Sequence, residues 1–193
     1  MQLEEGRGNH QSLISDKMET VAELLSQLPE EAKDLRINAK RVLAAEESLN
    51  AEQTWGTALA CAYFIRNAEL TEAVLADAKA AGLSDAVLSD AKGAACLMGQ
   101  NTIYYRFRHL MNDEQYNQRP ANLRMMRMQQ VASTKLNFEL FSIGPAALKG
   151  CEMCLKAHEA QVKAGGLNED NVHDAVRISA VLFGVAVALD TAI

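Results

Sequence analysis

Apolar residues recur three and four positions apart along almost all of the 193-residue chain, and no stretch alternates apolar and polar residues as a half-buried strand would. The first such face consists of Met18, Val21, Leu24, Leu25 and Leu28, and Pro29 follows it. Aromatic residues make up only 5% of the chain and proline is scarce, a composition that favours closely packed helices over sheet. The chain is therefore predicted to be all-α.

Residues that cap or end helices divide this pattern into elements. Asn50 and Gln53 form a predicted capping box, Ser84 is expected to cap a later helix, and Asn168 the last one. The helices expected are about 18–28, 30–45, 51–64, 69–81, 85–109, 123–130, 135–149, 151–164 and a long final helix, with the main loop at 112–122. Pro145 is expected to kink its helix or to start a new segment. The residues expected to face inward from the final helix are Val172, Ala175, Val176, Ser179, Ala180 and Phe183.

The length suits one domain. We expect a polar tail over residues 1–11 and a single all-helical domain over residues 12–193. The formal net charge of -6 argues against a nucleic-acid-binding protein, which needs a basic surface. No secretory signal is evident, and the apolar stretch Ile178–Leu189 is too short to span a bilayer as a helix. A cytoplasmic protein that does not enter the membrane is the expectation.

An internal repeat is visible at a spacing of 84 residues. Residues 79–99 match residues 163–183 with six identities, and both segments contain a helix end, a glycine, a leucine and a new helix start. The predicted halves are a degenerate repeat at about 50–110 and an active repeat at about 135–193. Two helices that merely end alike would give a similar match, so both interpretations stay open. If the repeat is real, Asn67, Leu70 and Val74 stand where the second half has Cys151, Cys154 and His158, so each chain has one active site.

The four cysteines carry the clearest chemical signal. Cys151 and Cys154 are three residues apart at a predicted helix start, so both sulfurs lie on one face, and the unpaired N–H groups there favour a thiolate. His158 follows one turn later on the same face, where an imidazole can take the thiol proton. This spacing predicts thiol–disulfide chemistry. Cys61 and Cys96 each stand alone in alanine-rich helices and are expected to pack in the core.

The order of attack is less constrained by spacing. The helix start favours Cys151 as the nucleophile and the histidine favours Cys154; we expect Cys154 to attack and Cys151 to resolve. Two alternatives stay open: zinc bound by both cysteines and His158, or an inert buried pair. The remaining histidines are expected in the tail (His10), on a solvated face (His109) and on the surface (His173).

The surroundings of this motif resemble a known family. The segments Lys135–Ser142 and Gly150–Glu159, together with Trp55–Thr57, Met98–Asn101 and Tyr104–Arg106, resemble the alkyl hydroperoxide reductase D family of the carboxymuconolactone decarboxylase-like superfamily. The likeness runs from about residue 24 to the end of the chain. It implies an all-helical, internally duplicated fold assembled as a homotrimer or a multiple of one.

The resemblance also implies a function. Members are disulfide reductases with weak peroxidase activity that pass electrons from a partner bearing a dihydrolipoamide group to a two-cysteine peroxiredoxin, with no bound metal or organic cofactor. By position, Cys151 and Cys154 match the redox pair, His158 matches the histidine of a proton relay, and Glu139 matches its glutamate. A carboxylate held against an imidazole fixes the imidazole tautomer and raises its basicity.

One departure from the family pattern bears on this function. Met153 stands where well-studied members often carry a histidine, and a thioether cannot move a proton, so peroxidase efficiency is more in doubt than disulfide exchange. Two other classes also remain: a decarboxylase-like lactone enzyme on the same fold, and a non-enzymatic, zinc-binding or structural helical oligomer.

Overall fold

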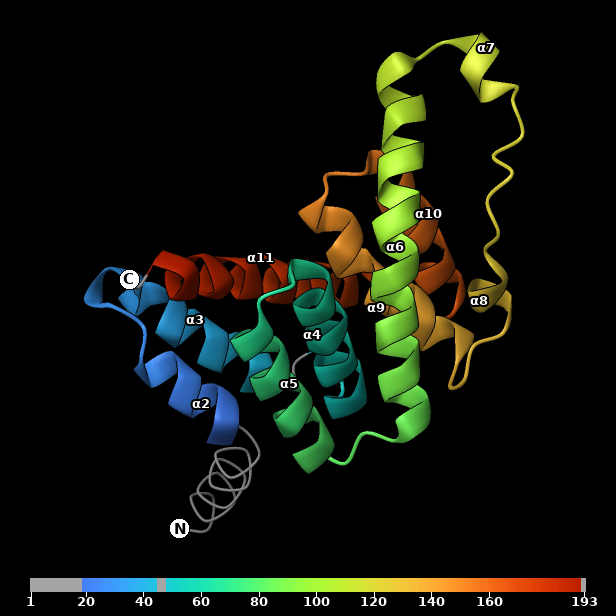
Figure 1. Cartoon of the computed structure of the whole chain (residues 1–193). Coiled ribbons are helices and arrows are strands. Elements are labelled where there is room, and N and C mark those ends of the chain that lie inside the picture. The colour runs from blue at the N-terminus through green and yellow to red at the C-terminus, as the bar shows by residue number, and fades with distance from the viewer. Residues whose placement is uncertain (1–18, 45–47, 192–193) are drawn as a thin grey trace.

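The computed structural model describes residues 19–44 and 48–191, and over these ranges every regular element is a helix, as predicted (Figure 1). In chain order they are α2 (Glu19–Ser26), the 3-10 turn η1 (Glu30–Ala32), α3 (Lys33–Ala44), α4 (Ala51–Ile65), α5 (Ala68–Ala80), α6 (Asp85–Met111), α7 (Glu114–Asn117), α8 (Met126–Gln129), α9 (Lys135–Leu148), α10 (Glu152–Ala164) and α11 (Glu169–Thr191). The predicted tail at 1–11, His10 and Met18 lie outside the described residues.

The helix boundaries follow the caps predicted from sequence. Asn50 and Gln53 exchange the two hydrogen bonds of a capping box at the start of α4. The Ser84 hydroxyl accepts the Val87 N–H at the start of α6, and the Asn168 side chain accepts backbone N–H groups at the start of α11. These local hydrogen bonds satisfy N–H groups that the helices leave free, which explains why single residues were enough to place the boundaries.

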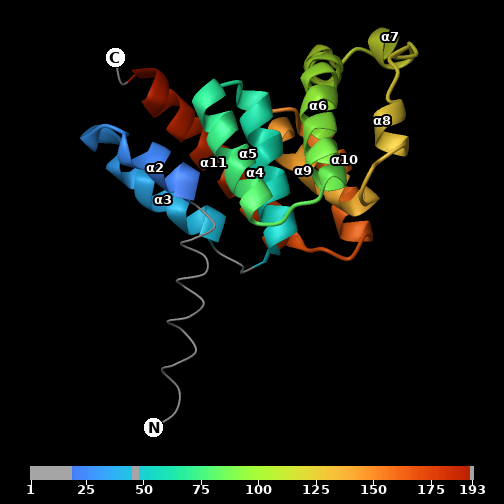
Figure 2. The ribbon, with the colours of Figure 1, turned by 60° about the horizontal axis from the view of Figure 1, so that its bottom comes forward.

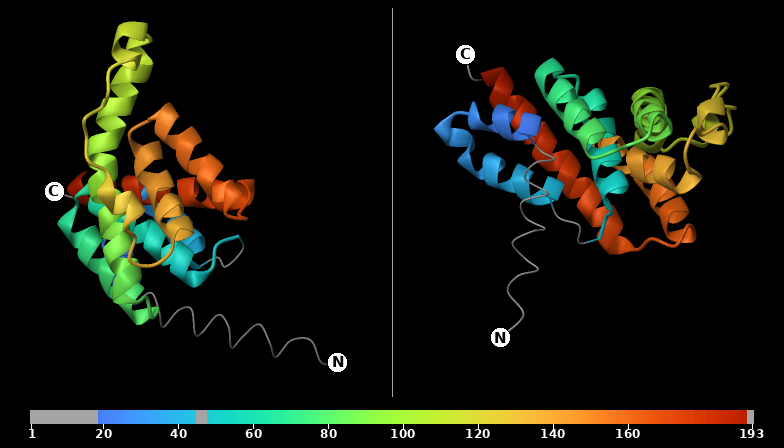
Figure 3. Two further views of the ribbon diagram at one scale, coloured as in Figure 1. Left: turned by 90° about the vertical axis from the view of Figure 1, so that its right-hand side faces the viewer. Right: turned by 90° about the horizontal axis from the view of Figure 1, so that it is seen from below.

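Four helices form the centre of the molecule. The helices α4, α6 and α9 pack against one another, and α11 crosses α4 and α9 and also covers α3, while α10 lies on α9 and α6 (Figures 1 and 2). Figure 3 shows α6 standing at one edge with its C-terminal end projecting beyond its neighbours, and the chain returning from α7 toward α8 beside it. The largest fully buried side chains include Phe138 and Phe141 of α9, so the helix that precedes the cysteine motif is the middle of the core.

Small residues allow these helices to approach closely. A Cβ placed on Gly56 of α4 would overlap the Phe141 ring, and one on Gly144 of α9 would overlap the Cys61 sulfur. Glycine at these two positions therefore lets α4 and α9 pack at a distance that no larger side chain permits.

Helix starts recur at the spacing found in the sequence. The helices α4 and α9 begin at 51 and 135, α5 and α10 at 68 and 152, and α6 and α11 at 85 and 169, each pair 84 residues apart. The residues that cap α5 and α10 also correspond: Asn67 accepts the Leu70 N–H through its side chain, and Cys151 accepts the Cys154 N–H in the same way.

Two predictions about the last third of the chain are wrong. Helix α9 continues through Pro145, so the alternative that a new segment starts there is wrong; proline lacks the N–H donor but keeps its carbonyl, which accepts the Lys149 N–H at the helix end. Ala180 and Phe183 are exposed, Phe183 by 53%, because the buried stripe of α11 lies on other positions. That stripe comprises Ala175, Ile178, Ser179, Leu182, Val185 and Ala186.

Helix α11 is long and apolar enough to cross a membrane by length and composition alone. In the fold it packs against α3, α4 and α9, so its apolar stripe is used in contacts within the chain.

Candidate redox site

The two motif cysteines lie at the start of α10 and are joined by a disulfide bond. Cys151 is the residue that caps the helix, and its sulfur accepts the backbone N–H of Cys154 at 3.4 Å. Gly150 precedes them with a φ of +60°, a backbone conformation that favours glycine and turns the chain from α9 into α10. Both sulfurs therefore face the positive end of the α10 dipole, which stabilises a thiolate when the bond is reduced.

The disulfide is enclosed by apolar side chains. Cys151 is fully buried and Cys154 is 5% exposed, and both pack with Met98 of α6 and Ala146 of α9. The partly buried side chains that complete this cluster are Phe64, Tyr105 and Leu155. Water is largely excluded around the pair, which strengthens electrostatic interactions with a thiolate formed there.

A carboxylate and an imidazole meet one turn further along α10. His158 Nδ1 lies 2.5 Å from Glu139 Oε2, and the two residues are 5% and 2% exposed. A carboxylate only accepts hydrogen bonds, so Nδ1 carries the proton in this pair and the lone pair of a neutral ring is on Nε2. The pairing across α9 and α10 that the family resemblance implied is thus present in the structure.

A lysine completes the surroundings of Glu139. Lys135 Nζ, half exposed on the preceding turn of α9, lies 2.8 Å from Glu139 Oε1. Burial acts to raise the pKa of Glu139, but the hydrogen bonds from His158 and Lys135 outweigh it and the pKa is lowered. Glu139 is therefore a carboxylate at neutral pH, with one oxygen on each partner.

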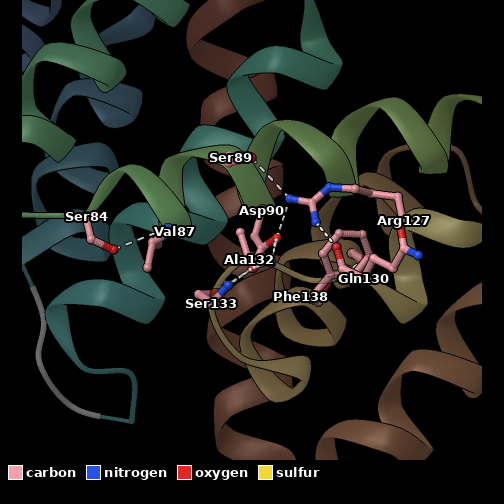
Figure 4. Close-up of polar contacts among 10 residues, drawn as sticks. Ser84, Val87, Ser89, Asp90, Arg127, Gln130, Ala132, Ser133 and Phe138 are labelled. Atoms are coloured by element: carbon pink, nitrogen blue, oxygen red, sulfur yellow. Dashed lines mark hydrogen bonds and ion pairs between the residues drawn. The ribbon is translucent and has the colours of Figure 1, made fainter.

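A buried carboxylate fixes the segment that leads into α9 (Figure 4). Asp90 of α6 is fully buried and accepts the N–H groups of Ala132 and Ser133 and the Ser133 hydroxyl, and it pairs with Arg127. Burial works against its charge, yet these hydrogen bonds lower the pKa of Asp90. Thr134 then caps α9 directly after this knot. The position of the first turn of α9, and with it that of Glu139, depends on this anchored segment.

The structure brings together all four residues singled out from the sequence. Cys151 and Cys154 are bonded, His158 lies one turn after Cys154 on α10, and Glu139 contacts His158 from α9. Within residues 19–44 and 48–191, no group of three or more histidine, cysteine, aspartate or glutamate side chains is arranged to hold a metal ion. The sequence reasoning missed Lys135, although its spacing of four residues from Glu139 on one helix is a recognisable ion-pair signal.

The other two cysteines differ from each other. Cys61 is fully buried, as expected, and burial raises the pKa of its thiol far above the usual range. Cys96 is exposed, so the prediction of a core position is wrong. The inward face of α6 in this region carries Ala94, Ala95 and Met98, and the helical period turns Cys96 outward.

The predictions for the two described histidines are confirmed. Both His109 and His173 are exposed. His109 Nε2 lies 3.0 Å from Glu152 Oε2 at the start of α10.

Comparison with known proteins identifies the family. Residues 115–193 match the carboxymuconolactone decarboxylase family. A protein of Anaeromyxobacter sp. (strain K) named alkyl hydroperoxide reductase AhpD is 46% identical over 175 residues, which are 91% of this chain and 93% of that protein. The chain belongs to the AhpD family. An AhpD protein of Rhodospirillum centenum is 43% identical over 89% of this chain and 91% of its own length. An AhpD protein of Brucella anthropi is 37% identical over 90% of this chain and 98% of its own length.

Membership of the AhpD family confirms the resemblance seen in the sequence and covers both halves of the chain. The decarboxylase family match begins after α6 and takes in α8 to α11, hence Glu139, both motif cysteines and His158. Met153, the residue that departs from the AhpD pattern, is 40% exposed, whereas the two motif cysteines, Cys151 and Cys154, are buried.

Proposed function

We propose that this chain is a thiol–disulfide oxidoreductase that reduces alkyl hydroperoxides and disulfides through Cys151 and Cys154. The observation that carries the proposal is the buried Glu139–His158 pair on the helix whose first turn holds the disulfide. Burying an ionisable carboxylate beside an imidazole costs considerable desolvation free energy. Such buried ionisable pairs are typical of sites that move protons. The names of the AhpD relatives support the same activity.

The proposed reaction begins with the reduced pair. His158 takes the proton of the Cys154 thiol, and the thiolate attacks the terminal oxygen of the hydroperoxide, so that a sulfur–oxygen bond forms as the oxygen–oxygen bond breaks. The leaving alkoxide receives the proton back from His158 and departs as the alcohol. The Cys151 thiol then attacks the Cys154 sulfenic acid, which forms the disulfide and releases water. Glu139 holds the imidazole in the tautomer that can accept the thiol proton.

Two electrons must then return from outside the chain. An external dithiol of the lipoyl type, carried by a partner protein, would reduce the disulfide by exchange, and a peroxiredoxin disulfide would be the acceptor when the enzyme acts as a reductase. The AhpD name of the relatives is consistent with a peroxiredoxin partner. The proposal needs no bound metal or organic cofactor, and it places the enzyme in the cytoplasm as a homotrimer or a multiple of one.

The proposal includes two repeated halves, of which one is active. The helix starts 84 residues apart and the corresponding caps at Asn67 and Cys151 support a duplicated framework. In the first half, Trp55 and Val74 occupy the places of Glu139 and His158, and both are buried apolar residues. The first half would then contribute packing and no proton transfer.

The match to the carboxymuconolactone decarboxylase family favours one competing function, a decarboxylase-type reaction on the same fold. The two functions differ in their need for sulfur. Under the proposal, Cys154→Ser abolishes peroxide-dependent loss of thiols, whereas a decarboxylase would keep its activity without either cysteine. A thiol count before and after addition of hydroperoxide, on wild type and Cys154→Ser reduced with dihydrolipoamide, decides between them. A pair that cannot be cycled between dithiol and disulfide excludes the proposal.

A further inference from the structure

A cleft of about 410 Å³ lies beside the redox site and is not used by the reaction described above. Its volume is within the range of small-molecule sites, about 300–1,000 Å³. It is formed where α4 and α9 end against the middle of α6. The residues that line it are Tyr63, Phe64, Arg66, Lys92, Ala95, Cys96, Gly99, Ile103 and Lys149.

The charge of the cleft is of one sign. Arg66, Lys92 and Lys149 are among its nine lining residues, and none of the nine is a carboxylate. Burial and the neighbouring Cys96 sulfur raise the pKa of Tyr63, so its hydroxyl stays protonated and can donate a hydrogen bond. In a protein with a net charge of -6, three cations around one cavity give it a local positive potential that attracts anions.

Aromatic rings hold two of the cations in place. Lys92 Nζ lies 5.9 Å from the centre of the Tyr63 ring and Lys149 Nζ lies 5.8 Å from the centre of the Phe64 ring. Contact with a ring face orients an ammonium group while leaving its other N–H donors free. The apolar part of the lining is thus placed next to the positive charges.

The backbone limits how much negative charge the cleft can take. Arg66 and Lys149 are the residues that end α4 and α9, where the helix dipoles are negative and partly offset the two side chains. The net field therefore suits a single negative charge on an apolar body better than a polyphosphate.

One side chain connects the cleft with the disulfide. Phe64 lines the cleft, and it also packs on the cluster that contains Cys151, Cys154 and Met98. Lys149, another lining residue, is two positions before Cys151 in the chain. A ligand held by its charged end in the cleft would therefore have an apolar part in contact with the wall of the redox site.

We propose that this cleft binds the carboxylate end of an amphipathic hydroperoxide, a fatty-acid hydroperoxide in chemical class, whose peroxide group reacts at Cys154. The substrate class rests on the function proposed above, but the binding of the carboxylate does not. The reaction is the same two-electron reduction, in which the hydroperoxide becomes a hydroxy fatty acid and water and the cysteine pair becomes a disulfide.

Cys96 supplies a binding assay that does not depend on turnover. In the oxidised protein Cys151 and Cys154 are bonded and Cys61 is buried, so Cys96, exposed in the cleft, is the thiol that reacts. We expect octanoate to slow the alkylation of Cys96 by iodoacetamide at concentrations about fivefold below those at which 1-octanol does so, since the alcohol lacks the charge. Equal protection by the two, or no protection by octanoate, overturns the inference.

Variants locate the effect. The double variant Lys92→Gln/Lys149→Gln should need about tenfold more octanoate for the same protection, and its ratio of kcat/KM for a fatty-acid hydroperoxide to that for cumene hydroperoxide should fall by a similar factor. The matched control is Lys40→Gln, an exposed lysine of α3, which should leave both quantities at the wild-type value. Equal behaviour of the double variant and the control also overturns the inference.

The two proposals fail separately. A protein that reduces cumene hydroperoxide but shows no preference for octanoate over 1-octanol keeps the proposed function and loses the carboxylate site. A protein that reduces neither hydroperoxide but is protected by octanoate keeps the site and loses the function.

Discussion

Replacing Glu139 by glutamine tests the proton relay most directly. The glutamine amide is close to the carboxylate in shape, and its oxygen can still accept a hydrogen bond from His158 Nδ1, which now lies 2.5 Å from Glu139 Oε2. The negative charge that stabilises the imidazolium during proton transfer is lost. The amide nitrogen would also face Lys135 Nζ, which now lies 2.8 Å from the other carboxylate oxygen, so two donors would meet.

The size of the effect follows from the position of Glu139 behind the histidine. Outer partners that orient a reacting imidazole typically contribute about 10- to 100-fold in activity. We therefore expect the rate of peroxide-driven disulfide formation in Glu139→Gln to fall by that factor, which corresponds to about 1.4–2.7 kcal/mol in activation free energy. The assay is a single turnover of the dihydrolipoamide-reduced protein with excess hydroperoxide, quenched with acid and followed by counting thiols, between pH 5 and pH 9.

The matched control is Glu159→Gln. Glu159 also forms an ion pair with a lysine four residues away, Lys163 at 2.9 Å, and it lies on the same helix as His158. Both side chains of that pair are, however, more than a third exposed. Its loss should change the rate by less than about twofold, as is usual for a surface ion pair. If Glu139→Gln reacts at the control rate at every pH in this range while its cysteines still cycle, Glu139 has no part in the reaction.

Three further predictions concern stability, measured by urea unfolding. Asp90→Ala should lower the free energy of unfolding by about 3–5 kcal/mol, because it leaves buried N–H groups and the Arg127 cation unpaired. The control Asp85→Ala, at an exposed position, should lower it by less than about 1 kcal/mol. Equal losses in the two variants would contradict the anchoring role of Asp90. Gly56→Ala should destabilise the protein by about 1–3 kcal/mol, because its Cβ would clash with the Phe141 ring. Gly99→Ala, whose Cβ meets no atom within 4 Å, should stabilise it by about 0.5–1 kcal/mol. A Gly56→Ala variant as stable as wild type would refute the close approach of α4 and α9. Folding lowers the pKa of Glu139, so its contribution to the free energy of unfolding is complete above the unfolded carboxyl pKa of about 4.3. That contribution is lost as the pH falls from there through the lower folded pKa. Over this acidic range, wild type should therefore lose stability more steeply than Glu139→Gln.

The features that could be predicted from the sequence are those set by neighbours in the chain. The capping box at Asn50 and Gln53, the glycine before Cys151 and the spacing from Cys154 to His158 each involve contacts within one turn or two of a helix. Such contacts form wherever the residues occur in a helix, so the pattern is sufficient evidence for them.

The features that could not be predicted depend on how helices rotate against one another. Cys96 and Phe183 lie in apolar sequence surroundings, and only the packing of α6 and α11 decides that both side chains are exposed. The contact of Glu139 with His158 spans 19 residues and two helices, and nothing local distinguishes Glu139 from a surface charge. The family resemblance supplied it because a match made position by position along the chain does not depend on local spacing.

The proposed duplication bears on how the framework can carry this chemistry. Under it, Trp55 and Val74 stand at the places of Glu139 and His158, and neither of these buried side chains carries a charge. A buried carboxylate is tolerated at the first of these places only where partners offset its desolvation. Lys135, one turn earlier on α9, supplies one such partner of Glu139 and His158 supplies the other, so a buried Glu139 without both would be destabilising. Removal of Lys135, which the sequence reasoning overlooked, should therefore leave His158 to offset the desolvation of Glu139 without help from a cation.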